Sequence, residues 1–363
     1  MKKILAFALA LMMILALVGC GGSQAKESTV PESTAPESTA PETSPPESSA
    51  PDAGISETYN WTAAMTVAET TTNYKIVDKF ATLINERSGG KITVDIYPAG
   101  QLGNTSEFTQ AVVAGSVDIG TGMTTDLVDF VPEEAIFDLP NLFPSIDVMR
   151  KVLSSDFIDV MNTYNKEGGI MMLGYADAGF RQLTSNKPVH SVADLAGQKI
   201  RTMTNPYHVA YWNALGANAT PMQFTEVFMS LQQGTIDGEE NPYMNIVGNN
   251  FQEVQKYIIE TNHIGHIITF FMNNALYEGL PDNVRALVDE CAAEAVQYGN
   301  SMSDESIAED KQTCIDAGCE IITLSEDELA NFQDKAQVVY DMVRGDLGDE
   351  LVDKALDAVK AAS

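Results

Sequence analysis

Basic residues are scarce in this chain of 363 residues. It contains 21 lysines and arginines against 51 aspartates and glutamates, which gives a formal net charge of −30 at pH 7. Because so negative a surface repels phosphate backbones, we expect no nucleic acid among its partners. An anionic ligand would have to be held by a few local cations against the charge of the whole chain.

The residues and motifs of common enzyme chemistries are also sparse. Four cysteines and four histidines are too few for a cysteine-rich scaffold or an array of metal clusters. The serine-hydrolase elbow, the phosphate-binding loop and the His-Glu-x-x-His zinc motif do not occur. His263 and His266 are three residues apart in a strand-like run, a spacing that predicts opposite faces. We therefore expect no catalytic residues, no metal site, no cofactor and no enzyme activity.

The cysteines favour a structural role. Cys20 lies near the N-terminus, and Cys291, Cys314 and Cys319 lie near the C-terminus. Outside the cytoplasm the last three allow one disulfide with three possible pairings, and the alternative is three buried free thiols.

The sequence of the N-terminus predicts a segment that is cleaved from the mature protein. Met1-Lys2-Lys3 precedes an uncharged apolar run from Ile4 to Val18, which is short for a membrane span and typical of a signal peptide over residues 1–19. The run ends in Leu17-Val18-Gly19-Cys20, which resembles the lipobox of bacterial lipoproteins. The resemblance implies a lipid on Cys20 that anchors the chain to a membrane. The alternative is a plain secretory signal followed by an incidental cysteine.

A low-complexity segment separates Cys20 from the rest of the chain. From Ser23 to Thr58 the sequence repeats PESTA-like units rich in serine, threonine, proline and glutamate. It has no apolar face to bury, so residues 20–58 are predicted to form an extended, disordered tether behind the lipidated cysteine. The folded part is expected to begin near Tyr59.

Strand-like and helical patterns alternate from there on. Short β-prone runs lie at 60–67, 91–97, 116–120, 169–175, 199–203, 235–237, 257–271 and 319–323. Helical stripes lie at 74–87, 147–167, 206–215, 225–233 and 281–316, and a capped helix starts at Asn104. This alternation predicts an α/β fold with mostly parallel sheets.

Arginine is the most informative residue type because the chain has so few of them. Arg87, Arg150, Arg285 and Arg344 lie among charged neighbours on helical stretches and are expected on solvated faces. Arg201 lies inside a strand and Arg181 beside one, where a buried guanidinium must find acceptors. Its planar fork fits a ligand carboxylate, and the alternative is a salt bridge to one of the chain's own acids.

Several separated motifs resemble one family. The runs GFRQLTSNKPV, DLAGQKIRTM, ALGANATPMQFTEVFMSLQQGTIDGEENP and FQEVQKYIIETNH, preceded by YPAGQLGN, AVVAGSVDIG and FDLPNLFP, stand in order at near-constant spacing. They resemble the DctP-type substrate-binding subunits of tripartite ATP-independent periplasmic (TRAP) transporters. The resemblance covers residues 59–363 and weakens after Ala317.

The resemblance implies a fold. It is a two-lobed α/β fold like that of periplasmic binding proteins, with crossing hinge strands and one long helix that spans both lobes. Lobe I is expected at 59–178 plus about 265–306. Lobe II, with the C-terminal helices, is expected at 179–264 plus about 307–363.

The resemblance also implies ligand-binding residues. Arg201 would hold the ligand carboxylate, Arg181 would supply a second cation, Asn241 would hydrogen-bond the same region, and Phe224 would lie against the ligand. The further positions expected near the ligand are Glu69 or its neighbours Thr70 to Asn73, Asn104, Met123, Thr124, Thr204 and Asn205. Met123 stands where sialic-acid binders tend to carry a carboxylate, so sialic acid is disfavoured.

The implied function is transport outside the cytoplasm. The chain is expected to be a lipid-anchored solute-binding protein that captures a small organic acid and delivers it to a TRAP permease in the membrane. Glu69, the Asn and Thr groups, and the aromatic Tyr211 and Trp212 favour a hexuronate or related sugar acid, although core packing is the alternative for the two aromatics. The other readings are a binder of a C4-dicarboxylate or another monocarboxylate, or a ligand-presenting sensor lipoprotein.

Overall fold

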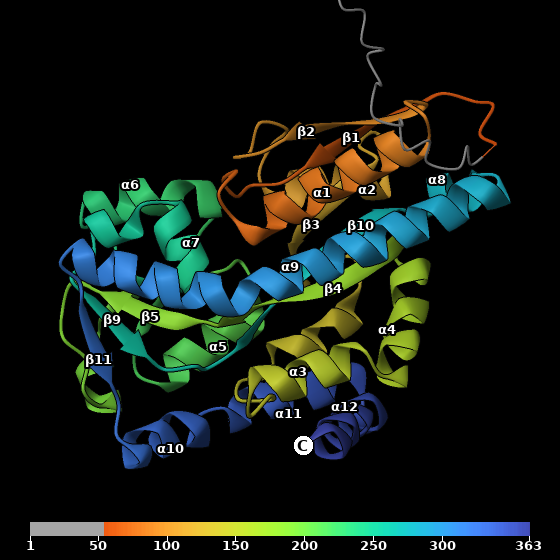
Figure 1. Cartoon of the computed structure of the whole chain (residues 1–363). Helices are drawn as coiled ribbons and strands as arrows, with labels where there is room; N and C mark the ends of the chain where they lie inside the picture. Colours follow the sequence, from red (N-terminus) through yellow and green to blue (C-terminus); the bar gives the residue numbers. More distant parts are fainter. Residues whose placement is uncertain (1–53) are drawn as a thin grey trace, which may run out of the picture. The chain divides into compact units, whose positions relative to one another are not determined.

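Two mixed β-sheets form the centre of the protein. The structure is a computed structural model and describes residues 54–363, all within one compact unit. The predicted signal peptide, Cys20 and nearly all of the predicted tether lie outside the described residues. The first sheet has the order β2-β1-β3-β10-β4 and the second the order β11-β9-β5-β8-β6-β7 (Figure 1).

Most predicted strands have a counterpart in the structure, but their bounds differ by a few residues, the run at 235–237 is not a strand, and the strands at 182–185 and 218–221 were not predicted. The first sheet contains β1 (Tyr59–Ala64), β2 (Ile92–Tyr97), β3 (Ile119–Met123), β4 (Ile170–Phe180) and β10 (Gly265–Asn273). The second contains β5 (Gln182–Ser185), β6 (Lys199–Thr202), β7 (Asn218–Pro221), β8 (Gly238–Asn241), β9 (Tyr257–Glu260) and β11 (Glu320–Thr323). The α/β class is confirmed. Five strand pairings among residues 54–363 are parallel, so the prediction of mostly parallel sheets holds by a narrow margin. The other four are antiparallel and join β10 to β3 and β4, and β5 to β8 and β9.

The antiparallel pairs arise where the chain crosses between the sheets. Strand β4 of the first sheet is followed by β5 of the second with only Arg181 between them. The chain returns from β9 to β10, so the run predicted as one strand at 257–271 is in fact two. Asn262, at φ 44°, bends the chain between them. All nine residues of β10 are buried, as expected for a strand in the middle of a molecule.

One long helix runs past both sheets. Helix α9 (Asp282–Asp316) has 35 residues and packs on α1, β4 and α7, which connects the halves of the molecule (Figure 1). The crossing strands and the spanning helix agree with the predicted two-lobed architecture, whereas the exact lobe boundaries stay a prediction.

The remaining helices surround the sheets. They are α1 (Thr72–Arg87), α2 (Thr105–Val113), α3 (Ile146–Leu153), α4 (Asp156–Glu167), α5 (Pro206–Ala214), α6 (Val227–Gln232), α7 (Tyr243–Gly248), α8 (Asn274–Gly279), α10 (Glu326–Asp334), α11 (Gln337–Leu347) and α12 (Asp349–Ala362). Short 3₁₀ turns include η1 (Thr124–Leu127), η2 (Pro132–Asp138) and η4 (Phe224–Glu226). The helix predicted at 147–167 is two helices, because Ser155 caps the start of α4. Helix α11 packs on α5 and α12 on α3 and α4, so the C-terminal helices contact both halves.

The positions of Arg150 and of the three C-terminal cysteines answer two expectations from the sequence. Arg150 was expected on a solvated face, but its Nε donates to buried Asp177 of β4 at 2.6 Å, and Nη2 pairs with Asp304 of α9. Cys291, Cys314 and Cys319 are buried free thiols.

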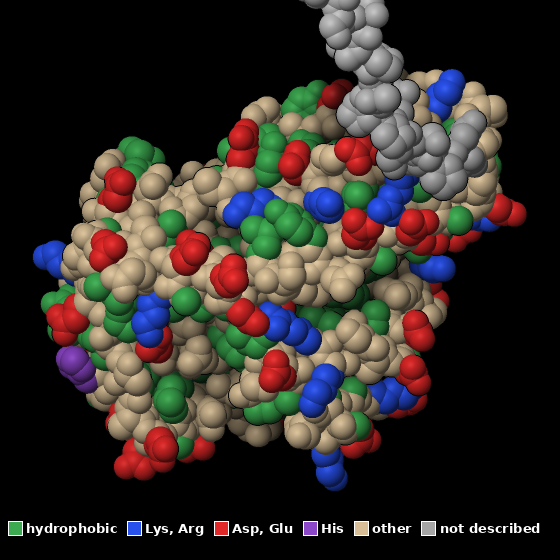
Figure 2. Space-filling model, in the orientation of Figure 1, with side chains coloured by type: hydrophobic (Ala, Val, Ile, Leu, Met, Phe, Trp, Pro, Cys, Tyr) green, Lys and Arg blue, Asp and Glu red, His purple; other side chains and the backbone are tan. Residues whose placement is uncertain are grey.

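On the face that carries α9, acidic and basic side chains are interspersed without a large patch of either sign (Figure 2). No helix between residues 54 and 363 has the length and apolar character to cross a bilayer.

Candidate functional site

A cavity of about 820 Å³, counted to its open mouth, lies between the two sheets. It is built where strands β1, β3, β6 and β8 end, which is where α/β folds place their ligands. The lining residues are Thr66, Val67, Asn73, Thr105, Ser106, Gly122, Met123, Thr125, Asp126, Val128, Asp129, Arg181, Arg201, Met203, Thr204, Asn205, Pro206, Met222, Gln223, Phe224, Asn241, Asn245 and His266.

Arg201 is the cation of this cavity that is not neutralised by a neighbouring acid. Strand β6 carries it into the interior, where it is 2% exposed. Its Nε and Nη2 donate to the backbone oxygen of Met222 at 3.1 and 2.7 Å, and Nη1 has no hydrogen-bond partner within residues 54–363. Burial lowers the pKa of Arg201 to about 10, against the opposing charges of Glu240 and Glu239. The guanidinium therefore has an unused, charged donor edge in a site of low dielectric constant.

Arg181 is placed differently. It is completely buried, with Nε 2.5 Å from Glu240 Oε2 and Nη2 2.8 Å from Oε1, so its fork is held by the chain's own carboxylate. This is the alternative that the sequence left open. Its Nη1 donates to His266 Nδ1 at 3.0 Å and lies 3.4 Å from Met123 Sδ, on the cavity side. Burial and the charge of Arg181 hold the pKa of His266 well below its usual range, so this imidazole is a neutral acceptor.

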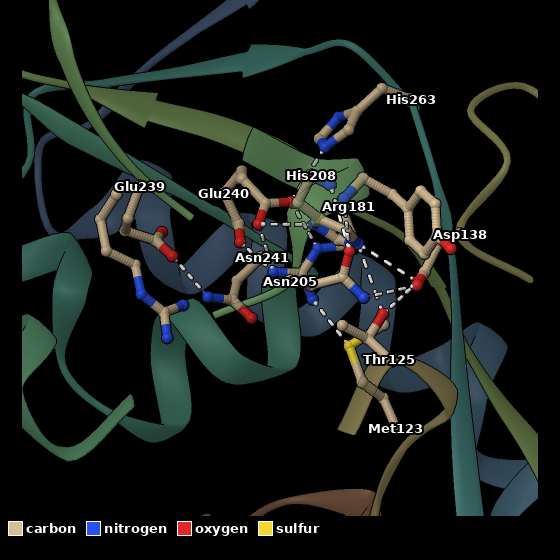
Figure 3. Close-up of polar contacts among 12 residues, drawn as sticks. Met123, Thr125, Asp138, Arg181, Asn205, His208, Glu239, Glu240, Asn241 and His263 are labelled. Carbon is tan, nitrogen blue, oxygen red and sulfur yellow. Dashed lines mark hydrogen bonds and ion pairs between the residues drawn. The ribbon is translucent and has the colours of Figure 1, made fainter. Parts of the chain in front are cut away.

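A buried polar network supports the arginines from behind (Figure 3). His208 lies with Nε2 3.2 Å from Asp138 Oδ1 and Nδ1 3.6 Å from Glu240 Oε1. Burial alone would lower the pKa of His208, but these two carboxylates raise it to about 9. His208 is therefore a buried imidazolium between an acid of η2 and an acid of β8.

His263 and His266 contact the two members of the same ion pair. His263 Nε2 lies 2.9 Å from Glu240 Oε2, and His266 Nδ1 lies 3.0 Å from Arg181 Nη1. His263 stands in the crossing between β9 and β10 rather than in a strand, so the strand alternation on which the expectation of opposite faces relied does not apply to the pair.

Four asparagines line the cavity, and three of them, Asn73, Asn241 and Asn245, form part of its polar wall. Asn241 Nδ2 donates to Glu239 Oε2 at 2.5 Å, and its Oδ1 accepts from Asn245 Nδ2 at 3.1 Å. Asn241 therefore has only its second amide hydrogen left for a ligand. Asn73 donates from Nδ2 to Thr121 Oγ1 and to the oxygen of Gly122, both at 3.1 Å. Asn73 and Asn245 each keep a side-chain Oδ1 without a partner in the described part of the chain.

The other predicted residues divide into two groups. Phe224 lines the cavity with its ring 5.7 Å from the Arg201 guanidinium carbon, and Met123, Thr204 and Asn205 line it as well. Asn205 also caps α5 and donates to Asp138 at 2.8 Å, so its side chain is already used.

Glu69, Asn104 and Thr124 are not among the lining residues, and each has a local reason. Glu69 is exposed in the loop before α1. Asn104 forms the predicted capping box with Glu107 at the start of α2, which leaves Thr105 and Ser106 to face the cavity. Thr124 is fully buried behind the wall, and its neighbour Thr125 lines it instead.

Tyr211 and Trp212 belong to the hydrophobic core. Both are completely buried in the cluster that includes Leu183 and Ile200, and neither lines the cavity. The core-packing alternative is therefore the one the structure shows. The sequence arguments for a sugar acid that used Glu69, Tyr211 and Trp212 lose their basis.

The clearest omission of the sequence analysis is Asp126. It stands in η1, half-buried, and lines the cavity, with Oδ2 accepting from the backbone nitrogen of Met123 at 2.9 Å. Asn245 and His266 were also missed. Only the position of Asp126 three residues after the predicted Met123 could have indicated it, because nothing in the local pattern distinguishes it from the chain's many surface acids.

The chemistry of the cavity is that of binding. It combines one buried cation that has an unused donor edge with amide oxygens, the half-buried carboxylate of Asp126 and the exposed carboxylate of Asp129. No group of three or more metal-ligating side chains occurs among residues 54–363. The arrangement can neutralise one negative charge and hydrogen-bond several polar groups.

Comparisons with known proteins agree with this geometry. The family described as "Bacterial extracellular solute-binding protein, family 7", DctP, matches residues 63–346. The C4-dicarboxylate-binding periplasmic protein DctP of Rhodobacter capsulatus is 31% identical over 304 residues, 82% of this chain and 89% of that protein.

Two solved structures have the same architecture. The sugar acid binding protein DctPAm of Advenella mimigardefordensis strain DPN7T, in complex with galactonate, superposes with a TM-score of 0.82 at 27% identity over 85% of this chain and 99% of that one. A TRAP periplasmic solute binding protein of Shewanella oneidensis with bound succinate superposes with a TM-score of 0.80. The two are 28% identical, and the match covers 83% of this chain and 99% of that one.

Proposed function

Since this chain belongs to family 7 of the bacterial extracellular solute-binding proteins, the DctP family, we propose that it captures a small organic acid in the cavity between its two sheets and delivers it to a TRAP permease. Family membership makes the protein an extracytoplasmic solute-binding protein and not an enzyme. The named relatives include one that binds galactonate and one with bound succinate, so the similarity supports an organic acid without selecting one.

The observation that carries the proposal is the unused edge of Arg201. Nη1 is buried, charged and without a partner in the part of the chain that the structure describes. A ligand carboxylate placed there would supply the missing acceptor and neutralise the charge. Phe224 and the remaining amide hydrogen of Asn241 stand in the same cavity to complete the contacts. Arg181, the second cation expected, is paired with Glu240 and donates from Nη1 to His266, so its contribution to the ligand is small.

Closure of the lobes fits the same proposal. The cavity is lined from both sides, by Asn73, Met123 and Thr125 with the first sheet and by Arg201, Phe224 and Asn241 with the second. A ligand that contacts both sides only in the closed state shifts the equilibrium toward that state. The closed form would then be the one presented to the permease.

The membrane anchor is a separate part of the proposal. We propose that Cys20 carries the lipid and that the segment before Tyr59 holds the binding domain away from the membrane. In cells that express the full chain, Cys20→Ala should move the protein from the membrane fraction to the soluble extracytoplasmic fraction without changing ligand affinity. A membrane-bound Cys20→Ala protein would refute the anchor and leave the binding function intact.

Ligand binding is tested on the purified protein. Hexuronates, aldonates, C4-dicarboxylates and sialic acid are screened by thermal shift, and titration calorimetry follows. A ligand at one hundred times its Kd stabilises the fold by about 2.7 kcal/mol, which for a folded part of this size raises Tm by roughly 4 °C. If no carboxylate in the screen raises Tm at millimolar concentration, organic-acid binding is refuted.

A further inference from the structure

The lining of the cavity carries a carboxylate of its own, that of Asp126. Asp126 reaches the cavity because Gly122 has no side chain: a Cβ on Gly122 would lie 2.6 Å from Asp126 Oδ2. Only Oδ2 has a partner among the described residues, the backbone nitrogen of Met123. Burial raises the pKa of Asp126 to about 6, against the lowering effect of the Met123 hydrogen bond, Arg181 and Arg201, so it is mostly ionised at pH 7. One carboxylate oxygen is left to accept from a ligand.

Two buried amide oxygens, on Asn73 of α1 and Asn245 of α7, add further acceptors to the cavity, and their orientation is fixed by their partners. Asn73 must present its NH₂ group to the backbone oxygen of Gly122, so its Oδ1 is an acceptor without a donor. Glu239 accepts from Asn241 Nδ2, which turns Asn241 Oδ1 toward Asn245 Nδ2 and leaves Asn245 Oδ1 unused. Asn73 is 2% exposed and Asn245 is 4% exposed, and both line the cavity.

The cavity therefore offers a ligand one unused donor edge, on Arg201, and three acceptor groups, on Asp126, Asn73 and Asn245, which we together call the acceptor wall. A second carboxylate on a ligand cannot donate a hydrogen bond to the oxygens of Asp126, Asn73 and Asn245. It would also place a second negative charge near the carboxylate of Asp126. Arg181 offers little compensation, because Glu240 already neutralises it. A hydroxyl group, in contrast, can donate to Asp126, Asn73 or Asn245 without adding charge. Buried polar groups that are left without partners impose strong discrimination between ligands.

We propose that Asp126 is a specificity-determining residue that restricts this site to hydroxylated monocarboxylates and rejects dicarboxylates. The inference rests on the proposed binding of an organic acid and names its class. The ligand places its single carboxylate on Arg201 and its hydroxyl groups on the acceptor wall formed by Asp126, Asn73 and Asn245. Aldonates and hexuronates have this chemistry, whereas succinate and aldarates carry a second carboxylate.

Matched ligand pairs test the proposal on the purified protein. Gluconate and glucarate, and likewise galactonate and galactarate, differ only in whether the last carbon is a hydroxymethyl or a carboxylate. Galacturonate, glucuronate, succinate and 4-aminobutyrate complete the panel, and Kd is measured by calorimetry at pH 7.5. We expect at least one hydroxylated monoacid to bind at least 100-fold more tightly than its diacid partner and than succinate.

The variant Asp126→Asn isolates the carboxylate. The new amide can still accept from Met123 and can donate to a second carboxylate, so the ratio of diacid to monoacid Kd should fall at least tenfold. Asp95→Asn is the matched control, because Asp95 is an exposed acid of β2 that does not line the cavity, and its neutralisation should change the ratio less than threefold. A ratio between two ligands does not depend on how much of the protein is folded.

The outcomes separate this inference from the function on which it rests. Succinate or an aldarate bound by the wild type as tightly as any monoacid would overturn the role of Asp126 and leave organic-acid binding standing. Preference for 4-aminobutyrate over every hydroxylated acid would overturn the assignment of hydroxyl groups to the acceptor wall. An unchanged ratio in Asp126→Asn would overturn the residue assignment, and absence of binding across the panel would remove the proposed function as well.

Discussion

Replacement of Arg201 by methionine is the sharpest test of the binding site. Nε and Nη2 of Arg201 are held by the Met222 carbonyl, so a ligand carboxylate uses the Nη1 edge. Loss of a buried, charge-assisted interaction of this kind costs about 3–5 kcal/mol. At about 1.4 kcal/mol for each factor of ten, Kd for the cognate acid should rise roughly 150- to 4,000-fold.

The same change has the opposite effect on the ligand-free protein. Burial lowers the pKa of Arg201 to about 10 from an ordinary value of 12.5, which corresponds to ~3 kcal/mol spent on keeping its charge buried. Methionine fills a similar volume without charge but leaves the Met222 carbonyl without its donor, a cost of about 1–3 kcal/mol. The ligand-free Tm should therefore stay constant or rise while the ligand-induced shift of Tm disappears.

Two further variants show whether the effect of Arg201→Met on affinity is due to the charge and geometry of this particular arginine. Arg201→Lys keeps the charge but cannot bridge Met222 and a ligand at once, so its affinity should fall between those of the wild type and Arg201→Met. Arg285→Ala removes an arginine that pairs on the surface with Asp282, and its affinity should match that of the wild type. Calorimetry and thermal unfolding are measured on all four proteins. A Kd for Arg201→Met within threefold of the wild type would refute the assignment of the carboxylate to this residue.

Two predictions concern stability alone. His208 has a pKa of about 9 in the fold and an ordinary value of 6.5, so it contributes ~3 kcal/mol that is fully present below pH 6.5 and is lost as the pH rises through 9. Denaturant titrations should show that the free energy of unfolding of the wild type falls between pH 7 and 9.5, whereas that of His208→Gln does not. If the free energy of unfolding depends on pH in the same way in both proteins, His208 is not a buried imidazolium. A Cβ on Gly238 would lie 2.1 Å from the Thr184 carbonyl oxygen, so Gly238→Ala should cost more than 3 kcal/mol or prevent folding. Gly345→Ala, in α11 with open space around it, should instead stabilise by about 0.5–1 kcal/mol, and equal Tm values for the two variants would disprove this packing argument.

Local signals in the sequence predicted local structure well. The Asn104-x-x-Glu107 spacing predicted a capping box, and the structure contains both of its hydrogen bonds. The apolar stripe at 281–316 predicted one long helix, which became α9. The position of Arg201 in a strand between Ile200 and Thr202 indicated a guanidinium that needs an acceptor, and the structure buries that residue. These features depend on neighbours within a few residues, so the sequence contains all the information they require.

The tertiary structure decided which charges meet. Arg181 and Glu240 are 59 residues apart, and they pair because β5 and β8 are antiparallel neighbours in the second sheet. That pairing left Arg201 with the unused edge, a division of roles that the two sequence positions did not reveal. Asp126 became part of the wall only because β3 ends beside the cavity and Gly122 leaves room for its carboxylate. Sequence fixes which groups must be buried, whereas strand order and register fix their partners, because those contacts join segments that the local pattern does not relate.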